Sequence, residues 1–302
     1  MSFWDTPTKD IPRQVVMTRR PIATKRPRAA RTALTLPGDK MLCVKAGVDA
    51  KVFNGQTLHI FVERDPAAQT RIAREINHLD CEWQPRFWRD QIDKLPLRML
   101  LDNESLDFAY LDFCAALNGN VARWIYTELS PALSEGATVA VTLSRNWRSG
   151  KYMKWWDTAI KRRGSAAKAI YQAAEQQIYS AECTGMVGDL GEYFDDSSVT
   201  ASTGYMLPAR GTSHWNQLLR PEYHDASVKI LSAFTVLLPY HDFELEACVE
   251  YRRNPEANTG HWMTTFVLTN FRRRETARVP HSLLKQVGAH VSPTMRPASL
   301  GR

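Results

Sequence analysis

Acidic side chains lie at the ends of two apolar runs in the first half of the chain. Glu63 and Asp65 come just after the run 58–62, and Asp112 lies near the end of the run 106–113. Continuous apolar runs are typical of strands that are buried on both faces of a parallel sheet. Because open α/β sheets bind ligands at the carboxyl ends of their strands, these carboxylates are candidate ligand-binding groups. A solvated acid at a strand end is the alternative for Glu63.

Two arginines and a tryptophan follow a later apolar run, 137–143. They are Arg145, Trp147 and Arg148, in the segment SRNWRS. Arginine side chains hold phosphates, and a tryptophan ring stacks on a nucleic-acid base. The pattern therefore predicts a nucleic-acid contact at the same edge of the sheet, with an ordinary polar loop as the alternative.

Basic residues gather at the two ends of the chain, which has a net charge of +7. Residues 11–38 contain seven basic residues and no acid, residues 272–302 contain seven basic residues and one acid, and the remainder is therefore acidic. This distribution excludes a uniformly basic, histone-like protein and favours nucleic acid as the partner of the ends. A solvating tail is the alternative for the first end, and protection of an edge strand for the second. The residues predicted to contact nucleic acid there are Arg19, Arg20, Lys25, Arg26, Arg28, Arg31, Arg272, Arg273 and Arg274.

Several kinds of chemistry lack their motifs. The five cysteines form no CxxC pair and the eight histidines form no HxH or HExxH pattern, so we expect neither a disulfide framework nor a metal site. The sequence has no GxxxxGKS/T loop, GxSxG elbow or GxGxxG turn, which argues against P-loop, serine-hydrolase and nicotinamide-dependent enzymes. It also has no run of about 20 apolar residues and no apolar region typical of a signal peptide. We therefore expect a cytoplasmic protein without a membrane partner.

The elements that must position these residues alternate between strands and helices in the first half. Asn54-Gly55 ends one helix, Pro66 begins the next, and residues 119–134 have the apolar spacing of an amphipathic helix that Gly136 ends. Short connections between alternating elements predict an α/β fold with a doubly wound, mostly parallel sheet. The predicted strands are 33–36, 58–62, 97–101, 106–113 and 137–143.

The second half has a different pattern. Residues 149–180 have helical spacing, and residues 181–226 are rich in Gly, Ser and Thr, which predicts an irregular segment. The clean alternation of 241–251, followed by a turn and by 262–271, predicts a C-terminal antiparallel hairpin. The predicted organisation is a basic flexible arm (1–32), a Rossmann-like half (33–148), a helical and irregular insertion (149–227), a closing helix and hairpin of the same sheet (228–274) and a basic tail (275–302).

This order of elements resembles the class I S-adenosylmethionine-dependent methyltransferases, over residues 33–143 and 228–271. The resemblance is to a divergent member, because the loop after the first strand lacks the glycine-rich GxGxG cofactor motif. It implies S-adenosylmethionine as the cofactor, with Pro37, Gly38 and Asp39 in that loop. It also implies that Glu63 or Asp65 binds the ribose hydroxyls and that Asp102, after the strand 97–101, lies beside the adenine. A plain turn residue is the alternative for Asp102.

The resemblance assigns catalysis to Asp112, Phe113 and Cys114. They occupy the place of the DPPY-like tetrapeptide of amino-group methyltransferases, which orients a target nitrogen and stacks a flipped base, although the prolines are missing here. They also resemble the D-x-P-C loop of cytosine-5 methyltransferases, in which the thiol acts covalently. A packed thiol is the alternative for Cys114, since the sequence supplies no partner to activate it.

Two functions follow as hypotheses. The first is a methyltransferase that acts on a DNA or RNA base, with S-adenosylmethionine as the methyl donor. The second is a catalytically inactive protein of the same fold that binds nucleic acid or serves as an assembly subunit, which the missing glycines and prolines suggest. A small-molecule methyltransferase whose ends only aid solubility is a third, weaker possibility.

Overall fold

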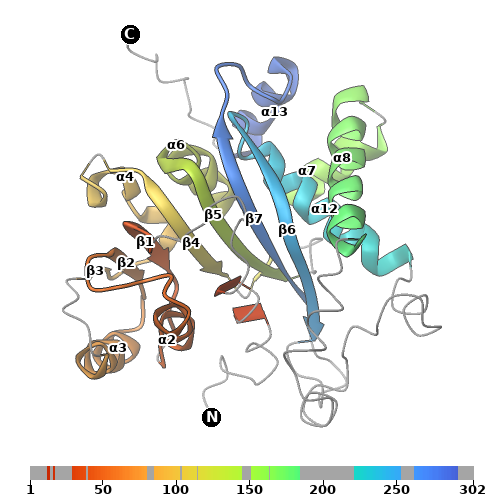
Figure 1. Cartoon of the computed structure of the whole chain (residues 1–302). Coiled ribbons are helices and arrows are strands. Elements are labelled where there is room, and N and C mark those ends of the chain that lie inside the picture. Colours follow the sequence, from red (N-terminus) through yellow and green to blue (C-terminus); the bar gives the residue numbers. More distant parts are fainter. Residues whose placement is uncertain are drawn as a thin grey trace, which may run out of the picture.

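One seven-stranded sheet organises the chain in the computed structural model (Figure 1). Its order is β3-β2-β1-β4-β5-β7-β6, with parallel pairing from β3 to β5 and antiparallel pairing of β7 with both of its neighbours. The structure describes residues 12, 13, 16, 17, 29–38, 40–79, 85–102, 104–113, 115–144, 151–162, 164–183, 221–252 and 262–291. The predicted α/β fold with a doubly wound, mostly parallel sheet is confirmed.

The first two strand–helix units form where the sequence predicts them. They consist of β1 (Thr32–Thr35), α2 (Leu42–Asp49), β2 (Leu58–Val62) and α3 (Pro66–His78). β1 is buried throughout and β2 almost throughout, as their continuous apolar runs require.

The third strand differs from the prediction. Residues 97–101 belong to the short helix α4 (Leu97–Leu100), which follows the 3-10 helix η2 (Ile92–Lys94). Leu97 and Leu101 are buried four residues apart, whereas Met99 is 75% exposed, which is helical spacing. The third strand is instead β3 (Arg86–Trp88), three half-buried residues at the edge of the sheet. A strand this short shows no periodicity that could reveal it.

The next unit confirms its helix and moves one boundary. β4 (Leu106–Asp112) is followed by α5 (Gly119–Trp124), a π-helical turn η3 (Ile125–Leu129) and α6 (Ser130–Ala132). β5 (Leu133–Ser144) then begins directly, so Gly136, with φ +74°, lies in the first part of the strand and does not end the helix.

The second half supplies three helices, a hairpin and a final helix. The helices are α7 (Lys151–Lys161), α8 (Ser165–Cys183) and α12 (Pro221–Val236); β6 (His241–Arg252), β7 (Trp262–Arg273) and α13 (His281–Val291) follow. The predicted hairpin is present. Its second strand enters the sheet between β5 and β6, so β6 runs parallel to the first five strands.

A β-bulge interrupts the alternation predicted for β6. The register shifts between Leu245 and Ala247, and the side chains before and after that point belong to different cores. Phe243 and Leu245 pack on the side of α12 and α13, whereas Ala247 and Val249 pack on the opposite side. An extra residue at a bulge reverses which face the following side chains occupy, so one uninterrupted alternation could not hold.

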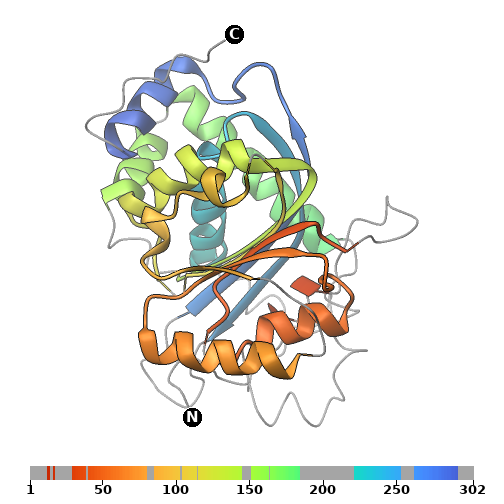
Figure 2. The ribbon, with the colours of Figure 1, turned by 90° about the vertical axis from the view of Figure 1, so that its left-hand side faces the viewer.

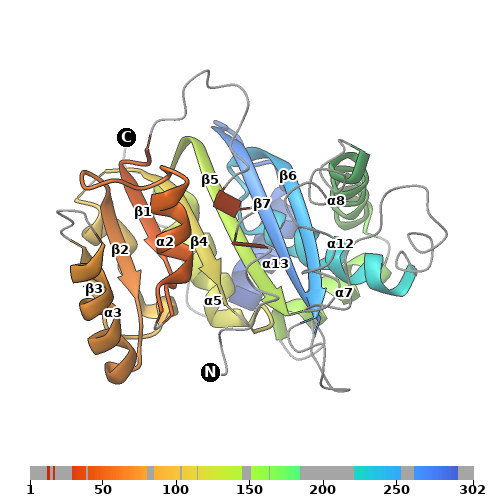
Figure 3. The ribbon, with the colours of Figure 1, turned by 60° about the horizontal axis from the view of Figure 1, so that its bottom comes forward.

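Helices cover both faces of the sheet (Figure 2). α2 and α3 pack on one face, and α5, α7, α8, α12 and α13 supply the larger core on the other. On the α2 face, Val16 and Met17 are 1% and 2% exposed and share a core with Ala140 of β5 and Val267 of β7. Figure 3 shows these described residues of the N-terminal segment in front of β5 and β7. This part of the segment predicted to be a flexible arm is therefore packed into the protein.

No helix among the described residues is long and apolar enough to cross a membrane.

Candidate functional site

Three of the predicted segments lie at the carboxyl edge of the sheet: the loop after β1, the residues after β2 and the end of β4. The strand order reverses between β1 and β4, because β1 continues through α2 to β2 on one side while β4 lies on its other side. The loop after β1 lies against the end of β4, since the Leu36 N–H donates to the Tyr110 carbonyl oxygen (3.3 Å). Such a reversal is where open α/β sheets form a ligand-binding crevice.

The loop after β1 turns sharply at Gly38. Its φ is +61°, a left-handed conformation that favours glycine, and its carbonyl oxygen accepts a hydrogen bond from the Met41 N–H (3.3 Å). A Cβ built on Gly38 would meet no atom within 4 Å, so the backbone faces open space. Pro37 is buried and its carbonyl oxygen accepts from the Cys43 thiol (3.8 Å). Asp39 lies outside the described residues.

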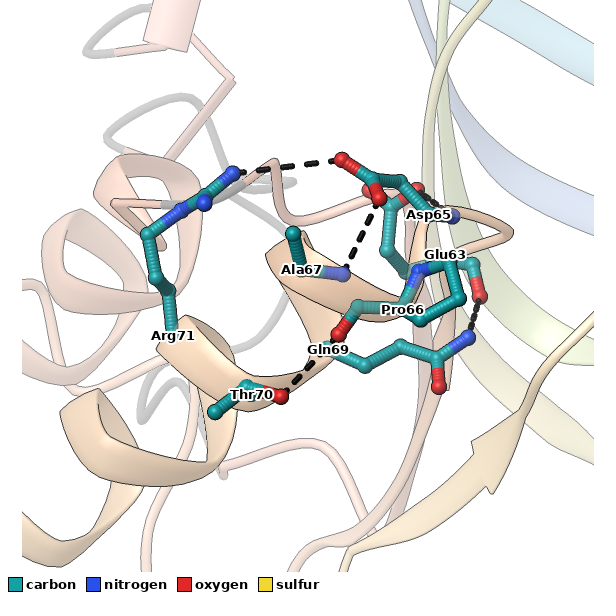
Figure 4. Close-up of polar contacts among 7 residues, drawn as sticks. All are labelled: Glu63, Asp65, Pro66, Ala67, Gln69, Thr70 and Arg71. Carbon is teal, nitrogen blue, oxygen red and sulfur yellow. Dashed lines mark hydrogen bonds and ion pairs between the residues drawn. The ribbon is translucent and has the colours of Figure 1, made fainter.

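Glu63 and Asp65 have different environments after β2 (Figure 4). Glu63 Oε1 accepts from the Asp65 N–H (2.8 Å), and among the described residues no donor reaches Oε2. Asp65 is the N-cap of α3, because its Oδ1 accepts from the Ala67 N–H (3.0 Å) and its Oδ2 lies 3.9 Å from Arg71 Nη2. Glu63 is thus the carboxylate with an oxygen left to accept from a ligand.

Asp102 does not lie at this edge. It follows α4 and precedes β4, and its Oδ2 is 2.5 Å from Nη2 of Arg86, the first residue of β3. Its place shortly before β4 and its contact with the first residue of β3 put Asp102 at the amino edge of the parallel strands. The expectation that it follows the third strand is wrong, because residues 97–101 form a helix.

Trp88 and Asp90, which no sequence pattern singles out, lie at the carboxyl end of β3. Trp88 ends the strand, its carbonyl oxygen accepts from the Glu63 N–H (3.1 Å), and its indole Nε1 donates to the Gln91 carbonyl oxygen (3.0 Å). Asp90 follows two residues later. A hydrogen bond from the Gln91 N–H, then one from Lys94, lowers the pKa of Asp90 below its usual value. Without β3 the sequence carried no signal for either residue.

Asp112 ends β4 beside the loop after β1, and Phe113 follows it. By the alternation of β4, Asp112 lies on the α2 face with Phe108 and Tyr110, which belong to the core of that face. Phe113 packs against the opposite core, and its N–H donates to the Thr142 carbonyl oxygen of β5 (3.2 Å). Cys114 lies outside the described residues, so the prediction that it supports catalysis stays a prediction.

Of the basic residues predicted to contact nucleic acid, those that the structure describes lie at the opposite edge of the sheet. Arg31 precedes β1, and its N–H donates to Oδ2 of Asp107 at the start of β4 (2.9 Å). Arg272 and Arg273 end β7 and Arg274 follows it; Arg273 pairs with His241, the first residue of β6. The structure does not bring these arginines together with Gly38, Glu63 and Asp112.

Two of the three arginines at the end of β7 have acidic partners. Arg272 Nη2 lies 3.5 Å from Glu244 Oε1, and Arg274 Nη1 lies 3.0 Å from Asp242 Oδ1. Their contact with nucleic acid remains a prediction. The other predicted contacts, which are Arg19, Arg20, Lys25, Arg26, Arg28, Arg145, Trp147 and Arg148, lie outside the described residues.

The described part of the chain contains no group of three or more His, Cys, Asp or Glu side chains that could hold a metal ion.

Comparisons with known proteins give matches in structure only. No protein-family model and no curated protein matches the sequence. TYW2 of Pyrococcus horikoshii in complex with MeSAdo is 11% identical with a TM-score of 0.38, over 88% of this chain and 63% of that one. TrmN from Thermus thermophilus is 9% identical with a TM-score of 0.38, over 87% and 48%. The O-methyltransferase from Bacillus cereus in complex with SAH is 9% identical with a TM-score of 0.42, over 89% and 84%. The chain thus spans less than two thirds of TYW2 and about half of TrmN.

The strand order itself defines the fold class. Six of the seven strands run in one direction, the strand order reverses between β1 and β4, and the antiparallel strand β7 is inserted between β5 and β6. This is the arrangement that the resemblance in the sequence implies. The chain therefore has the fold of the class I S-adenosylmethionine-dependent methyltransferases, in a divergent form whose first loop lacks the GxGxG motif. A fold alone fixes no activity.

Proposed function

We propose that the chain binds S-adenosylmethionine at the carboxyl edge of its sheet and transfers the methyl group to a nucleic-acid base. The observation that carries the proposal is Glu63. It directly follows β2, the neighbour of β1 on one side of the reversal in strand order, and its Oε2 has no donor among the described residues. A carboxylate there can accept hydrogen bonds from two ribose hydroxyls.

The loop after β1 also suits the cofactor, despite its single glycine. Gly38 presents its backbone to open space with a positive φ, so no side chain blocks the close approach of a ligand. When bound, the cofactor supplies an electrophilic methyl group. The protein's own part is to hold the acceptor against it, with Asp112 and Phe113 at the end of β4 as the nearest candidates.

Titration with S-adenosylhomocysteine tests the cofactor site. We expect a micromolar dissociation constant for the full chain, and at least about a tenfold weaker one for Glu63→Gln, because an amide accepts less strongly than a carboxylate. Asp65→Asn is the matched control. Asparagine caps helices as well as aspartate, so this variant should bind like the unmodified chain.

No heat and no thermal shift with the unmodified chain would contradict the cofactor site. That result would favour the alternative, a protein of this fold that binds nucleic acid or assembles with a partner without catalysis. If Glu63→Gln and Asp65→Asn weakened the binding of S-adenosylhomocysteine equally, Glu63 would not be the residue that contacts the ribose.

Support for a nucleic-acid acceptor comes from the sequence after β5. The Ser144 N–H donates to the Ala115 carbonyl oxygen (3.0 Å), so the end of β5 lies beside the residues that follow Asp112. Arg145, Trp147 and Arg148 come next in the sequence. Phosphate contacts from arginines and stacking on tryptophan are the interactions that hold a polynucleotide.

The salt dependence of nucleic-acid binding tests this acceptor. We expect Arg145→Ala/Arg148→Ala to weaken binding of DNA or RNA and to reduce the slope of log K against log salt by about 1 to 2, since each lost phosphate contact removes roughly one unit. Arg272→Ala/Arg273→Ala, at the opposite edge, is the matched control. If the control lost more affinity for DNA or RNA than the test variant, the nucleic acid would contact the amino edge of the sheet.

A further inference from the structure

An arginine is buried on the α2 face of the sheet without a place in the site described so far. Arg13 is 9% exposed, on the same N-terminal segment as Val16 and Met17, which pack against β5, β6 and β7. Arginine is almost never this deeply buried unless a counter-charge accompanies it. The segment therefore carries a positive charge into the core of this face.

Asp112 is the acid on that face of β4. It shares the face with Tyr110, which is 3% exposed, and with Phe108, and α2 covers the same area with Cys43. Burial raises the pKa of the Cys43 thiol to about 12, Arg13 lowers it and Asp112 raises it further, so both charges lie within electrostatic range of this one sulfur. The same two residues shift the pKa of Tyr110 in opposite directions, with burial as the larger cause.

This cluster lies directly behind the proposed cofactor loop. The Cys43 thiol donates to the Pro37 carbonyl oxygen (3.8 Å), one residue before Gly38. A hydroxyl pair, Thr142 Oγ1 and Thr265 Oγ1 at 2.7 Å, extends the buried polar groups from β5 to β7. Cys43 thus connects the loop that presents its backbone to a ligand with the part of the core in which Arg13 and Asp112 lie.

We propose that Arg13 is a positioning residue for Asp112: it docks the N-terminal segment on the sheet and balances the carboxylate charge behind the Pro37–Gly38 loop. The docking stands on the packing alone, whereas the effect on the ligand rests on the proposed function. In this arrangement the charge of Arg13 serves the interior of the protein and is not one of the charges that contact nucleic acid.

A double-mutant cycle on unfolding tests the docking without any ligand. Arg13→Gln and Asp112→Asn should each raise the unfolding equilibrium constant at least about tenfold, because one leaves the half-buried Asp112 carboxylate without its partner and the other leaves the buried Arg13 charge without its partner. The double variant should be at least about fivefold more stable than the product of the two effects predicts. Arg274→Gln and Asp242→Asn form the matched control cycle at an exposed ion pair, where we expect additive effects. Additivity in the Arg13–Asp112 cycle would overturn the proposal.

The ratio of affinities for S-adenosylmethionine and S-adenosylhomocysteine tests the charge balance. Only the first ligand carries a sulfonium cation, so the ratio reports the net charge near the loop. Arg13→Gln should shift it toward S-adenosylmethionine and Asp112→Asn toward S-adenosylhomocysteine, each by at least about fivefold, and the double variant should restore it. Arg13→Lys keeps the charge and should keep the ratio.

The outcomes separate this proposal from the proposed function. If the unmodified chain binds neither ligand, the cofactor site fails while the unfolding cycle still decides the pairing of Arg13 with Asp112. If both ligands bind and the ratio moves in the same direction in both single variants, the effect is structural and the charge balance is overturned.

Discussion

At the scale of single residues, His59 makes stability depend on pH. It is fully buried in β2 between the rings of Phe53 and Phe61, with ring centroids 4.7 and 4.2 Å away, and its Nε2 lies 3.0 Å from Thr35 Oγ1. Burial lowers the pKa of His59 from 6.5 to about 3, because the charged ring would have to leave water.

The sign of this effect follows from which state binds the proton. Below about pH 6.5 the unfolded chain takes up a proton at His59 that the folded protein refuses until about pH 3. The free energy of unfolding therefore falls by about 1.4 kcal/mol per pH unit in this window from His59 alone. We expect His59→Gln to lose about 2 to 3 kcal/mol less than the unmodified chain between pH 6.5 and 4.5 in denaturant titrations. Parallel curves for the two proteins would contradict a neutral buried His59.

Residue types at strand ends predicted part of the site. Glu63 and Asp112 lie at the carboxyl edge as their positions after apolar runs indicate, because a strand's direction fixes where its last residue emerges. The sequence could not separate Glu63 from Asp65, since only the fold makes Asp65 a helix cap. Asp102 was misplaced because residues 97–101 were predicted as the third strand and form a helix. With β3 not predicted, Trp88 and Asp90 could not be selected.

At the scale of elements, α2 depends on one glycine for its contact with the loop that follows it. A Cβ on Gly47 would overlap the ring of Phe53, with Phe53 Cζ at 3.2 Å and two further ring atoms closer still. Phe53 cannot move away easily, because it is 2% exposed and packs edge-on against Phe108 at 5.2 Å. The turn is also closed by the Val52 N–H, which donates to the Gly47 carbonyl oxygen (2.7 Å).

We therefore expect Gly47→Ala to lower the free energy of unfolding by about 1 to 3 kcal/mol, as overpacking does in a dense core. Gly288→Ala is the matched control in α13, where an added Cβ meets no atom within 4 Å. That variant should gain about 0.5 to 1 kcal/mol from the higher helix propensity of alanine. The free energy of unfolding of both variants is measured by thermal and chemical unfolding. If Gly47→Ala and Gly288→Ala changed it equally, the overlap with Phe53 would be contradicted.

Elements were predictable where a periodic pattern was long enough. Apolar runs predict buried strands such as β2 and β4, and the alternation of apolar and polar residues predicts the hairpin. β3 has three residues and so no period. The bulge after Leu245 depends on pairing with β7, which no local pattern in β6 contains. Short elements and the register between distant strands therefore could not be predicted from local sequence patterns.

At the scale of the whole molecule, the charge pattern showed that both ends of the chain are basic. It did not show that part of the N-terminal segment packs on the sheet. The sequence predicts an arm for residues 1–32 because this segment is rich in proline and arginine and its apolar content is too low to fold alone. The few apolar residues present are nevertheless what the fold uses, since Val16 and Met17 fill a face of β5, β6 and β7 that α2 and α3 leave uncovered (Figure 3). A sheet of this width needs cover on both faces, so the segment completes a layer.

Removing residues 1–17 tests whether the molecule needs this cover. We expect the truncated chain to lose about 3 to 6 kcal/mol in the free energy of unfolding, because two apolar side chains leave a buried site and expose the strands beneath them. Removal of residues 1–11 is the matched control, since it keeps Arg13, Val16 and Met17 and should change stability little. Both chains are compared by urea titration. Equal stability of the two would show that the segment is an arm after all, and the basic charge at this end would then be available to a polyanion along its whole length.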